Sequence, residues 1–258
     1  MSVEVLVATM NQTDRTLVEK MNIQTAALVG NQCSNNSVDE FLWNNKRIVY
    51  YSFAERGVGL NRNNTLMRAT GDYCLFADDD MRYVDGYEQI VERAFDRHKD
   101  ADVIVFNLIE HTQTRKRIEK DSRVGWFNFL RYGTARIGIR TASVRKRGIY
   151  FNQCFGGGTE HCHGEDNLFL ASCLSAGLKI YAVTDEIAEL LEERESSWNK
   201  GYDEKYIHDQ GVLFRAMSRR WWRFFCFQDA IRRHKSYGVG FWKAYSLMVE
   251  GAKAFCRG

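Results

Sequence analysis

Short apolar runs alternate with amphipathic stretches along the first two-thirds of the chain, and this alternation limits the folds that the chain can adopt. Apolar runs typical of strands cover residues 3–8, 26–29, 47–52, 73–77 and 103–107. Stretches with helical periodicity cover residues 14–21, 60–69 and 86–97. We therefore predict an α/β fold with a mostly parallel sheet flanked by helices on both faces. In such sheets, ligands bind beyond the carboxyl ends of the strands.

The pattern is weaker after residue 110. We expect a strand at 136–140, a helix at 166–176 with Gly177 as its C-cap, and a strand at 179–183. Everything after about residue 186 is predicted to be helical. We interpret the chain as a domain of residues 1–200 followed by a helical C-terminal extension of residues 201–258, with a soft boundary between them.

The composition is that of a globular protein with a sizeable core, because 45% of the 258 residues are apolar and 27% are charged. The N-terminus lacks the basic and apolar regions of a signal peptide, and no apolar run reaches the roughly 18 residues of a membrane-spanning helix. Seven cysteines without a Cys-x-x-Cys pair indicate neither a disulfide framework nor a zinc ribbon. These features favour a cytoplasmic protein.

Positive charge and aromatic side chains gather toward the C-terminal end. From Arg215 onward the chain has ten Lys or Arg and two Asp or Glu, together with several Trp, Phe and Tyr residues. Such a segment can contact an anionic membrane surface, contact nucleic acid, or pack on the domain with a solvated basic face. The packed helix and the membrane surface stay open as alternatives, and we expect no nucleic acid partner.

Three carboxylates, Asp78, Asp79 and Asp80, directly follow the predicted strand at 73–77. Like charges at a strand end repel one another. The cluster is therefore either an exposed acidic loop or a site where a divalent cation with oxygen ligands neutralises the charge. Charge alone does not decide between these two interpretations.

Three further features are candidates for the same site. The first predicted strand ends at Thr9-Met10-Asn11, whose small and polar groups suit a base or ribose. Arg62 lies near the start of a helix, where it can pair with phosphate or brace the acidic cluster. A Gly156-Gly157-Gly158 run precedes Glu165-Asp166 at the start of another helix. Taken singly, these residues can equally be turn residues, a surface charge and a helix N-terminus.

In this order and spacing, the motifs resemble the inverting glycosyltransferase family 2 of the GT-A fold. The resemblance covers roughly residues 1–200 and rests on Gly59-Leu60-x-Arg62-Asn63, Phe76-x-Asp78-x-Asp80 and Gly164-Glu165-Asp166. It implies a GT-A, Rossmann-like domain that moves a sugar from a nucleoside-diphosphate donor to a hydroxyl group. UDP is the donor nucleotide that the resemblance favours. The implied acceptor is a glycan or lipid-linked glycan in cell-surface polysaccharide synthesis.

The resemblance also implies roles for individual residues. Asp78 and Asp80 would hold a Mn²⁺ or Mg²⁺ ion at the donor diphosphate, where a Lewis acid stabilises the leaving group. The nucleotide would be bound by Thr9, Asn11, Arg62 and Asp79. Asp166 would be the general base for the acceptor hydroxyl, a role that typically contributes about 10²–10⁴-fold in rate, and Glu165 would position the acceptor.

Two departures from the family pattern affect the nucleotide pocket. The family usually opens with a Pro-x-Tyr-Asn-like turn, whereas this chain has Thr9-Met10-Asn11 and no proline. Where the family generally places an acidic pair that reads the base, this chain has Val29-Gly30-Asn31-Gln32-Cys33. Because amides both donate and accept hydrogen bonds, dTDP, GDP and CMP donors stay open beside UDP.

Two other functions are compatible with parts of the sequence. A nucleotidyl- or phosphoryl-transfer enzyme could hold two metals at the acidic cluster, but the chain lacks a phosphate-cradling glycine loop. A non-catalytic protein could bind anionic lipid or nucleic acid through the tail, which would leave the strand-end carboxylates without a role.

For the enzyme, we expect a cytoplasmic location, peripheral on the inner face of the membrane. A third metal contact or a phosphate-holding lid is expected after Glu192, with Trp198, Lys200 and His208 as candidates.

Overall fold

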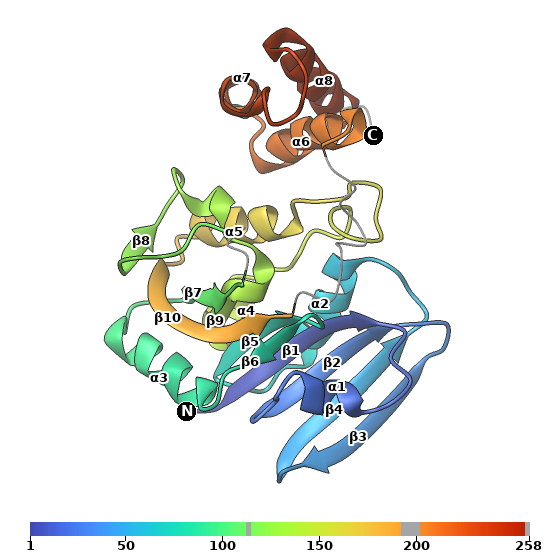
Figure 1. Ribbon diagram of the computed structural model, residues 1–258, viewed down its shortest axis with the longest axis vertical. Helices are drawn as coiled ribbons and strands as arrows, with labels where there is room; N and C mark the ends of the chain where they lie inside the picture. The colour runs from blue at the N-terminus through green and yellow to red at the C-terminus, as the bar shows by residue number, and fades with distance from the viewer. Residues whose placement is uncertain (112–114, 192–201, 256–258) are drawn as a thin grey trace.

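The computed structural model describes residues 1–111, 115–191 and 202–255 (Figure 1). Its strands are β1 (Val3–Met10), β2 (Ala26–Gln32), β3 (Ser37–Trp43), β4 (Lys46–Phe53), β5 (Tyr73–Asp78), β6 (Met81–Tyr83), β7 (Val103–Ile109), β8 (Ser122–Val124), β9 (Ile137–Arg140) and β10 (Ile180–Leu190). Its α-helices are α1 (Thr16–Lys20), α2 (Val58–Arg68), α3 (Tyr87–Arg97), α4 (Thr141–Lys146), α5 (Glu165–Ser175), α6 (Glu204–Met217), α7 (Trp222–Arg233) and α8 (Phe241–Ala254).

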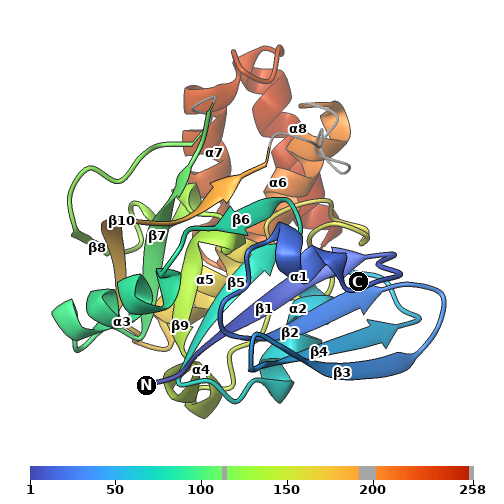
Figure 2. The same ribbon diagram turned by 60° about the horizontal axis from the view of Figure 1, so that its bottom comes forward.

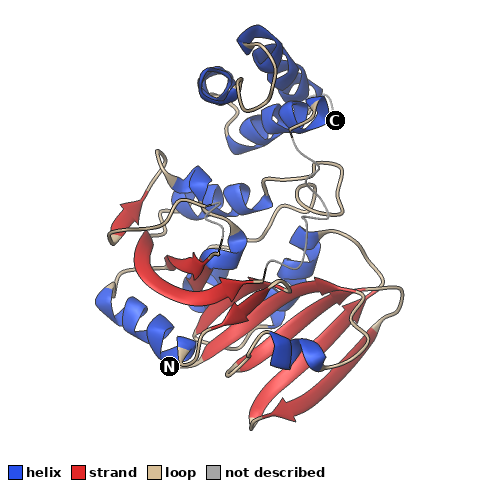
Figure 3. Ribbon diagram, viewed as in Figure 1, coloured by secondary structure: helices blue, strands red, loops and turns tan. Residues whose placement is uncertain are grey.

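The described strands form one sheet in the order β3-β4-β2-β1-β5-β9-β7-β10-β6, with β8 paired to β10. The central strands β4, β2, β1 and β5 are parallel, and β7 is parallel to β10. Figure 3 shows helices on both faces of this sheet. The predicted α/β fold with a mostly parallel, helix-flanked sheet is therefore confirmed.

The core consists of two apolar layers, one on each face of the sheet. Because successive side chains of a strand point to opposite faces, β5 contributes to both layers. Leu75 and Ala77 pack in the layer that holds residues of α1 and α3. Cys74 and Phe76 pack in the layer that holds residues of α2, α4 and α5. By the same alternation Asp78, the last residue of β5, lies on the face of Cys74 and Phe76, where it meets Arg62 of α2.

Three parts of the sheet differ from the sequence prediction. The edge strand β3 was not predicted, because its exposed outer position leaves it without a continuous apolar run; the Asn44-Asn45 turn, with φ of 46° and 61°, is the hairpin signal that identifies it. Strand β9 lies antiparallel between β5 and β7. The prediction that all residues after about 186 are helical is wrong for 186–190, because β10 continues to Leu190 and pairs with β6 and β7.

The C-terminal helices α6, α7 and α8 form a unit with a small core of its own. Helices α6 and α8 lie unusually close, because a Cβ at Gly211 would be 1.8 Å from the carbonyl oxygen of Met248. Helix α6 also packs on α5 through Val212, Leu213 and Leu168. Figures 1 and 2 show the unit at the end of the molecule farthest from β3.

The boundary predicted near residue 200 lies outside the described residues, as do Trp198 and Lys200. Within the described ranges, every helix is too short or too polar to cross a membrane.

Candidate functional site

The carboxyl ends of β1 and β5 lie side by side at the centre of one sheet edge. β1 pairs with β2 on one side and with β5 on the other, so the direction in which strands are added reverses at this point. Such a switch point is the usual ligand site of an open α/β sheet. Here the hydroxyl of Thr9 donates a hydrogen bond of 2.5 Å to Oδ2 of Asp79.

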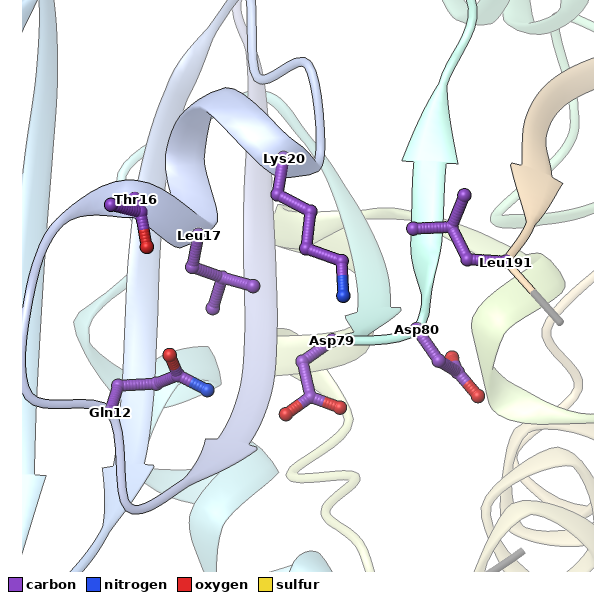
Figure 4. A pocket seen from close by; sticks show the side chains of 7 residues that line it. All are labelled: Gln12, Thr16, Leu17, Lys20, Asp79, Asp80 and Leu191. Carbon is purple, nitrogen blue, oxygen red and sulfur yellow. The ribbon is translucent and has the colours of Figure 1, made fainter. Parts of the chain in front are cut away.

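A pocket of about 200 Å³ opens beside Asp79 and Asp80, on the α1 side of this edge. It is lined by Gln12, Thr16, Leu17, Lys20, Asp79, Asp80 and Leu191 (Figure 4). Lys20 and Gln12 both point toward Asp79 in this view. Nε2 of Gln12 donates a hydrogen bond of 2.9 Å to the hydroxyl oxygen of Thr9. The pocket thus joins a cationic and an amide side chain to two carboxylates.

The side chain of Asn31, at the end of β2, is hydrogen-bonded to the backbone of the loop after β1. Its Oδ1 accepts a hydrogen bond of 2.9 Å from the backbone N–H of Gln12, and its Nδ2 donates to the Gln12 carbonyl at 3.0 Å. Nδ2 also donates to the hydroxyl of Ser52 at 3.1 Å. Because Asn31 is buried and its amide is occupied, Gln12 is the amide that faces the pocket.

Arg62 connects the two acidic motifs. Its guanidinium lies 2.6 Å from Oδ1 of Asp78 and 2.8 Å from Oε1 of Glu165, and its side chain is only 5% exposed. Burial lowers the pKa of Arg62, but the charges of Asp78 and Glu165 outweigh that effect and raise it. The arginine therefore stays protonated and fixes β5 to the start of α5 at this edge.

Asp80 carries charge that its neighbours do not neutralise. Burial raises its pKa, and the negative charges of Asp78 and Asp79 raise it further, while Arg115 opposes them. A bound cation would relieve this repulsion. Asp80 and Asp78 thus differ sharply in electrostatic environment, although only Asp79 separates them in the chain.

The acid pair Glu165-Asp166 occupies the first turn of α5, where the helix dipole favours negative charge. Glu165 is bonded to Arg62, and a Cβ at Gly156 would lie 2.7 Å from its Oε2, so only glycine permits this close approach. Oδ1 of Asp166 accepts hydrogen bonds of 2.7 Å and 2.8 Å from the backbone and side chain of Asn167.

The other carboxylate oxygen of Asp166, Oδ2, accepts no hydrogen bond from the described residues. A Cβ at Gly133 would lie 3.6 Å from it, so the glycine leaves space there. Burial raises the pKa of Asp166 to about 7, and the charge of Glu165 adds to the effect, whereas Asn167 and Arg62 act in the opposite direction. This is a carboxylate that gains and loses a proton near neutral pH.

The loop before α5 is held by α6. Asp209 accepts a hydrogen bond of 2.6 Å from Lys205 and lies 3.3 Å from Nδ1 of His161. Nε2 of His163 lies 2.9 Å from Oε1 of Gln210, and burial lowers the pKa of His163. Both histidines therefore contact side chains of α6. Nδ1 of His208, a candidate for a third metal contact, lies 3.5 Å from Asp209 instead.

The donor set suits a hard divalent cation even though, in the described ranges, no three His, Cys, Asp or Glu side chains converge on a metal centre. Mg²⁺ is commonly held by one or two carboxylates together with substrate phosphates and water, and carboxylates suit Mn²⁺ as well. Asp80 offers uncompensated negative charge, and Asp78 retains Oδ2 because Arg62 engages its Oδ1. These residues therefore fit such an ion only in company with a phosphate-bearing ligand.

The structure brings most of the predicted site residues to one edge, but in two groups. Thr9, Asp79 and Asp80 lie on the α1 side, where the pocket opens. Arg62, Asp78, Glu165 and Asp166 lie on the α2 and α5 side. Asn11 is exposed, with a left-handed backbone at φ 55°, and makes no contact with either group through its side chain within the described ranges.

Sequence reasoning missed three polar residues of the pocket: Gln12, Thr16 and Lys20. They lie in the loop after β1 and in α1. The one signal that could have indicated them is a helical periodicity that puts Thr16 and Lys20 one turn apart. Asp209 was also missed. It accepts a hydrogen bond from the backbone N–H of Cys162 in the loop before α5, but the two residues are 47 positions apart in the chain.

Comparisons with known proteins bear on the family and the fold. Residues 32–157 match the model of the family described as glycosyl transferase family 2. No curated protein is significantly similar to the chain.

The solved structures that resemble this fold include three of S. aureus TarS. Residues 1–349 of TarS in complex with UDP-GlcNAc align with a TM-score of 0.65 and 18% identity, covering 96% of this chain and 76% of that one. The same fragment in complex with UDP aligns with a TM-score of 0.61 and 16% identity, covering 98% and 92%. TarS itself aligns with a TM-score of 0.60 and 16% identity, covering 99% and 50%. At these identities the likeness concerns the fold, and it confirms the predicted GT-A class.

Proposed function

Because residues 32–157 match the model of glycosyltransferase family 2, we propose that the chain moves one sugar from a nucleoside-diphosphate donor to an acceptor hydroxyl, with inversion of the anomeric centre. The observation that carries the proposal is the linkage of two acidic motifs through buried Arg62 at the carboxyl edge of the sheet. One motif suits a leaving diphosphate and the other suits an attacking hydroxyl. A single displacement needs both functions at one edge.

The donor lies in the pocket beside Asp79 and Asp80. Thr9 and Asp79 bind the ribose side of the nucleotide, Gln12 faces the base, and Lys20 adds positive charge for the diphosphate. UDP is the first donor nucleotide to test, because the TarS structures that share this fold contain UDP-GlcNAc and UDP. Asn11 belongs to the same loop and contributes to the nucleotide site through its turn.

Asp80, with Oδ2 of Asp78, would hold a Mn²⁺ or Mg²⁺ ion at the diphosphate. Such an ion supplies Lewis-acid stabilisation of the negative charge that develops on the leaving group. Arg62 keeps Asp78 in position by binding its other oxygen, and it gives the same support to Glu165.

Asp166 acts as the general base. Asn167 fixes its Oδ1, so Oδ2 is left to accept the proton of an acceptor hydroxyl beside Gly133. Its raised pKa makes it a stronger base than an ordinary aspartate while it remains partly ionised at neutral pH. Glu165, held by Arg62, positions the acceptor.

The test is a calorimetric titration of UDP, dTDP, GDP and CMP into the purified protein, with and without Mn²⁺. We expect UDP to bind in a Mn²⁺-dependent manner, and a panel of UDP-sugars to yield UDP and a glycoside of inverted configuration. Release of pyrophosphate would instead support nucleotidyl transfer. A folded protein that binds none of the four nucleotides would overturn the proposal.

We further propose a glycan or lipid-linked glycan of cell-surface polysaccharide synthesis as the acceptor, with the enzyme peripheral on the inner face of the membrane. Residues 1–200 would be the transferase domain and residues 201–258 the part that meets the membrane. The excess of Lys and Arg after Arg215 supports this division.

A further inference from the structure

One face of α7 carries large apolar side chains in contact with solvent. Phe224, Phe227 and Ile231 are 56%, 44% and 52% exposed, and Trp221, directly before the helix, is 56% exposed. At about 100° per residue, these four side chains fall within roughly a third of the helix circumference. They form a continuous stripe, which we call the α7 stripe.

Helix α8 extends the α7 stripe at one end. The ring of Phe227 lies 5.6 Å from that of Phe241, and Phe241 lies 4.8 Å from Trp242. Trp242 is 75% exposed. Isolated apolar side chains on a surface are ordinary, but a contiguous group of six aromatic and aliphatic residues indicates an interaction site.

The stripe contributes little to the packing of the C-terminal unit, because among its four residues only Phe227 has a ring contact with α8 within the described ranges. The opposite face of α7 supplies Cys226 and Ala230 to the small core shared with α6 and α8. Helix α7 packs against these two helices, and Figures 1 and 2 show it at the outer end of the molecule. The fold therefore leaves this apolar face for something outside the described chain.

Arginines border the stripe on both sides. By the same helical periodicity, Arg223 lies along one border and Arg232 along the other, and Arg219 and Arg220 precede the helix. None of these four arginines forms an ion pair with a carboxylate of the described residues, in contrast to Arg233, which lies 3.5 Å from Asp229. The border of the stripe is thus cationic, although Asp229 offsets part of the charge of Arg232.

We propose that the α7 stripe docks on an anionic lipid surface. An apolar face with Trp and Phe, bordered by arginines, has the chemistry of a helix that lies in the membrane interface, with its rings among the acyl chains and its cations at the phosphates. A second copy of the chain fits less well, because a twofold contact would bring the same arginines together. A nucleic acid would use the arginines but leave the stripe in water.

Docking has a consequence for the proposed acceptor site, and only this consequence rests on the proposed function. The unit that carries the stripe also contributes α6, whose Asp209 holds the loop before Glu165-Asp166. Helix α6 packs directly on α5. A docked C-terminal unit would therefore hold the acid pair at a fixed height above the bilayer, where a lipid-linked acceptor is available.

The experiment is co-sedimentation of the full chain, without nucleotide, with vesicles of phosphatidylcholine alone or of phosphatidylcholine mixed with phosphatidylglycerol. We expect binding that requires phosphatidylglycerol and weakens as salt is raised. The triple variant Phe224→Ser, Phe227→Ser and Ile231→Ser should lose at least about tenfold in vesicle affinity. The double variant Arg223→Glu and Arg232→Glu should lose the phosphatidylglycerol dependence.

The matched control is Val38→Ser with Leu42→Ser on the edge strand β3, since these side chains are 64% and 71% exposed, and the arginine opposite Leu42, Arg47, is paired with Glu40. This control should bind vesicles like the parent chain. Mn²⁺-dependent UDP binding should persist in every variant, which separates lost docking from misfolding and from failure of the donor proposal.

Equal binding to both vesicle types, or undiminished binding by the triple variant, would overturn the proposal. Absence of vesicle binding, together with a dimer that dissociates in the triple variant, would assign the face to a second copy and overturn it as well.

Discussion

The two acidic motifs of the site, one at the end of β5 and one at the start of α5, have the same arrangement. Each contains one carboxylate that is paired with an arginine and one whose pKa is raised. In each motif one carboxylate is bonded to Arg62: Asp78 in the first and Glu165 in the second. In each, a close neighbour has a raised pKa, because burial and nearby negative charge disfavour its ionised form: Asp80 in the first and Asp166 in the second.

The difference between the motifs lies in what remains for a ligand. Asp80 borders an open pocket and carries charge that a cation can neutralise. Asp166 has one oxygen fixed by Asn167 and the other beside the space left by Gly133. In each motif the carboxylate paired with Arg62 therefore fixes the local geometry, and the carboxylate with the raised pKa is the one available to a ligand.

The largest effect should come from removing the uncompensated acid of α5. Asp166→Asn should lower kcat by about 10²–10⁴-fold, because the acceptor hydroxyl loses its base. Mn²⁺-dependent UDP binding should be retained, because the variant leaves the β5 motif intact. Steady-state transfer assays measure the first result and calorimetry measures the second. Glu160→Gln, at an exposed carboxylate of the same loop, is the control and should keep full activity. Full activity in Asp166→Asn would remove this residue from the role.

Removing the shared arginine should damage both motifs through stability. Arg62→Met leaves two carboxylates without their buried partner, and breaking a buried pair costs about 3–5 kcal/mol. We expect the lower end of that range, because the Asp78 side chain is 38% exposed and regains water. Urea unfolding gives the free energy of unfolding. Arg56→Met, at an exposed arginine, should change it by no more than ~0.5 kcal/mol, and a similar small change for Arg62→Met would contradict the bracing role.

The β5 motif can be tested by exchanging its paired and uncompensated members. Asp80→Asn should weaken Mn²⁺-dependent UDP binding by at least about 10–100-fold. Mutation of a residue that only supports a metal ligand already costs that much, and Asp80 is proposed to bind the metal itself. Asp78→Asn should weaken it less but lower the unfolding free energy more, because Arg62 loses a partner. Calorimetry and urea unfolding on both variants provide the comparison. Equal losses of nucleotide affinity would show that the two carboxylates do not differ in function.

The pH dependence of transfer should report the base. Burial, aided by the charge of Glu165, raises the pKa of Asp166 to about 7, and only the ionised carboxylate can accept a proton. We therefore expect kcat to rise with pH, up to about tenfold per unit below that pKa, and to level off above it. A profile measured from pH 5 to 9 at saturating Mn²⁺ and donor tests this. A rate that is flat between pH 5 and 7 would contradict the assignment.

The smallest expected effect is a change of stability with pH. The pKa of Asp166 is raised in the folded chain, so the native state binds its proton more readily than the unfolded state does between pH 4 and 7. The contribution of this group to the unfolding free energy therefore falls as the pH rises through that window. Urea unfolding at pH 5 and pH 8 should show Asp166→Asn gaining stability relative to the parent chain at the higher pH. No relative change would mean that the carboxylate is not buried in this way.

Local patterning was enough to predict the elements that build the site. Apolar runs at 3–8 and 73–77 correspond to β1 and β5, and the periodicity at 60–69 and 166–176 corresponds to α2 and α5. Strand-helix alternation then implied that the carboxyl ends of β1 and β5 share one edge. The strand expected at 136–140 corresponds to β9, but its antiparallel position between β5 and β7 was beyond this reasoning, because nothing local records which neighbour a short strand will pair with.

From the sequence alone one could predict the likeness to glycosyltransferase family 2, the GT-A class and the order of the acidic motifs, since these depend on residue types and their spacing along the chain. Only the tertiary structure decided which carboxylates are paired, because Arg62 lies 16 residues from Asp78 and 103 residues from Glu165 in the chain. It also decided that Gln12 and Lys20 share a pocket with Asp79, and that α6 holds the loop before α5. Charge compensation depends on distance and burial, and both arise only when the chain has folded.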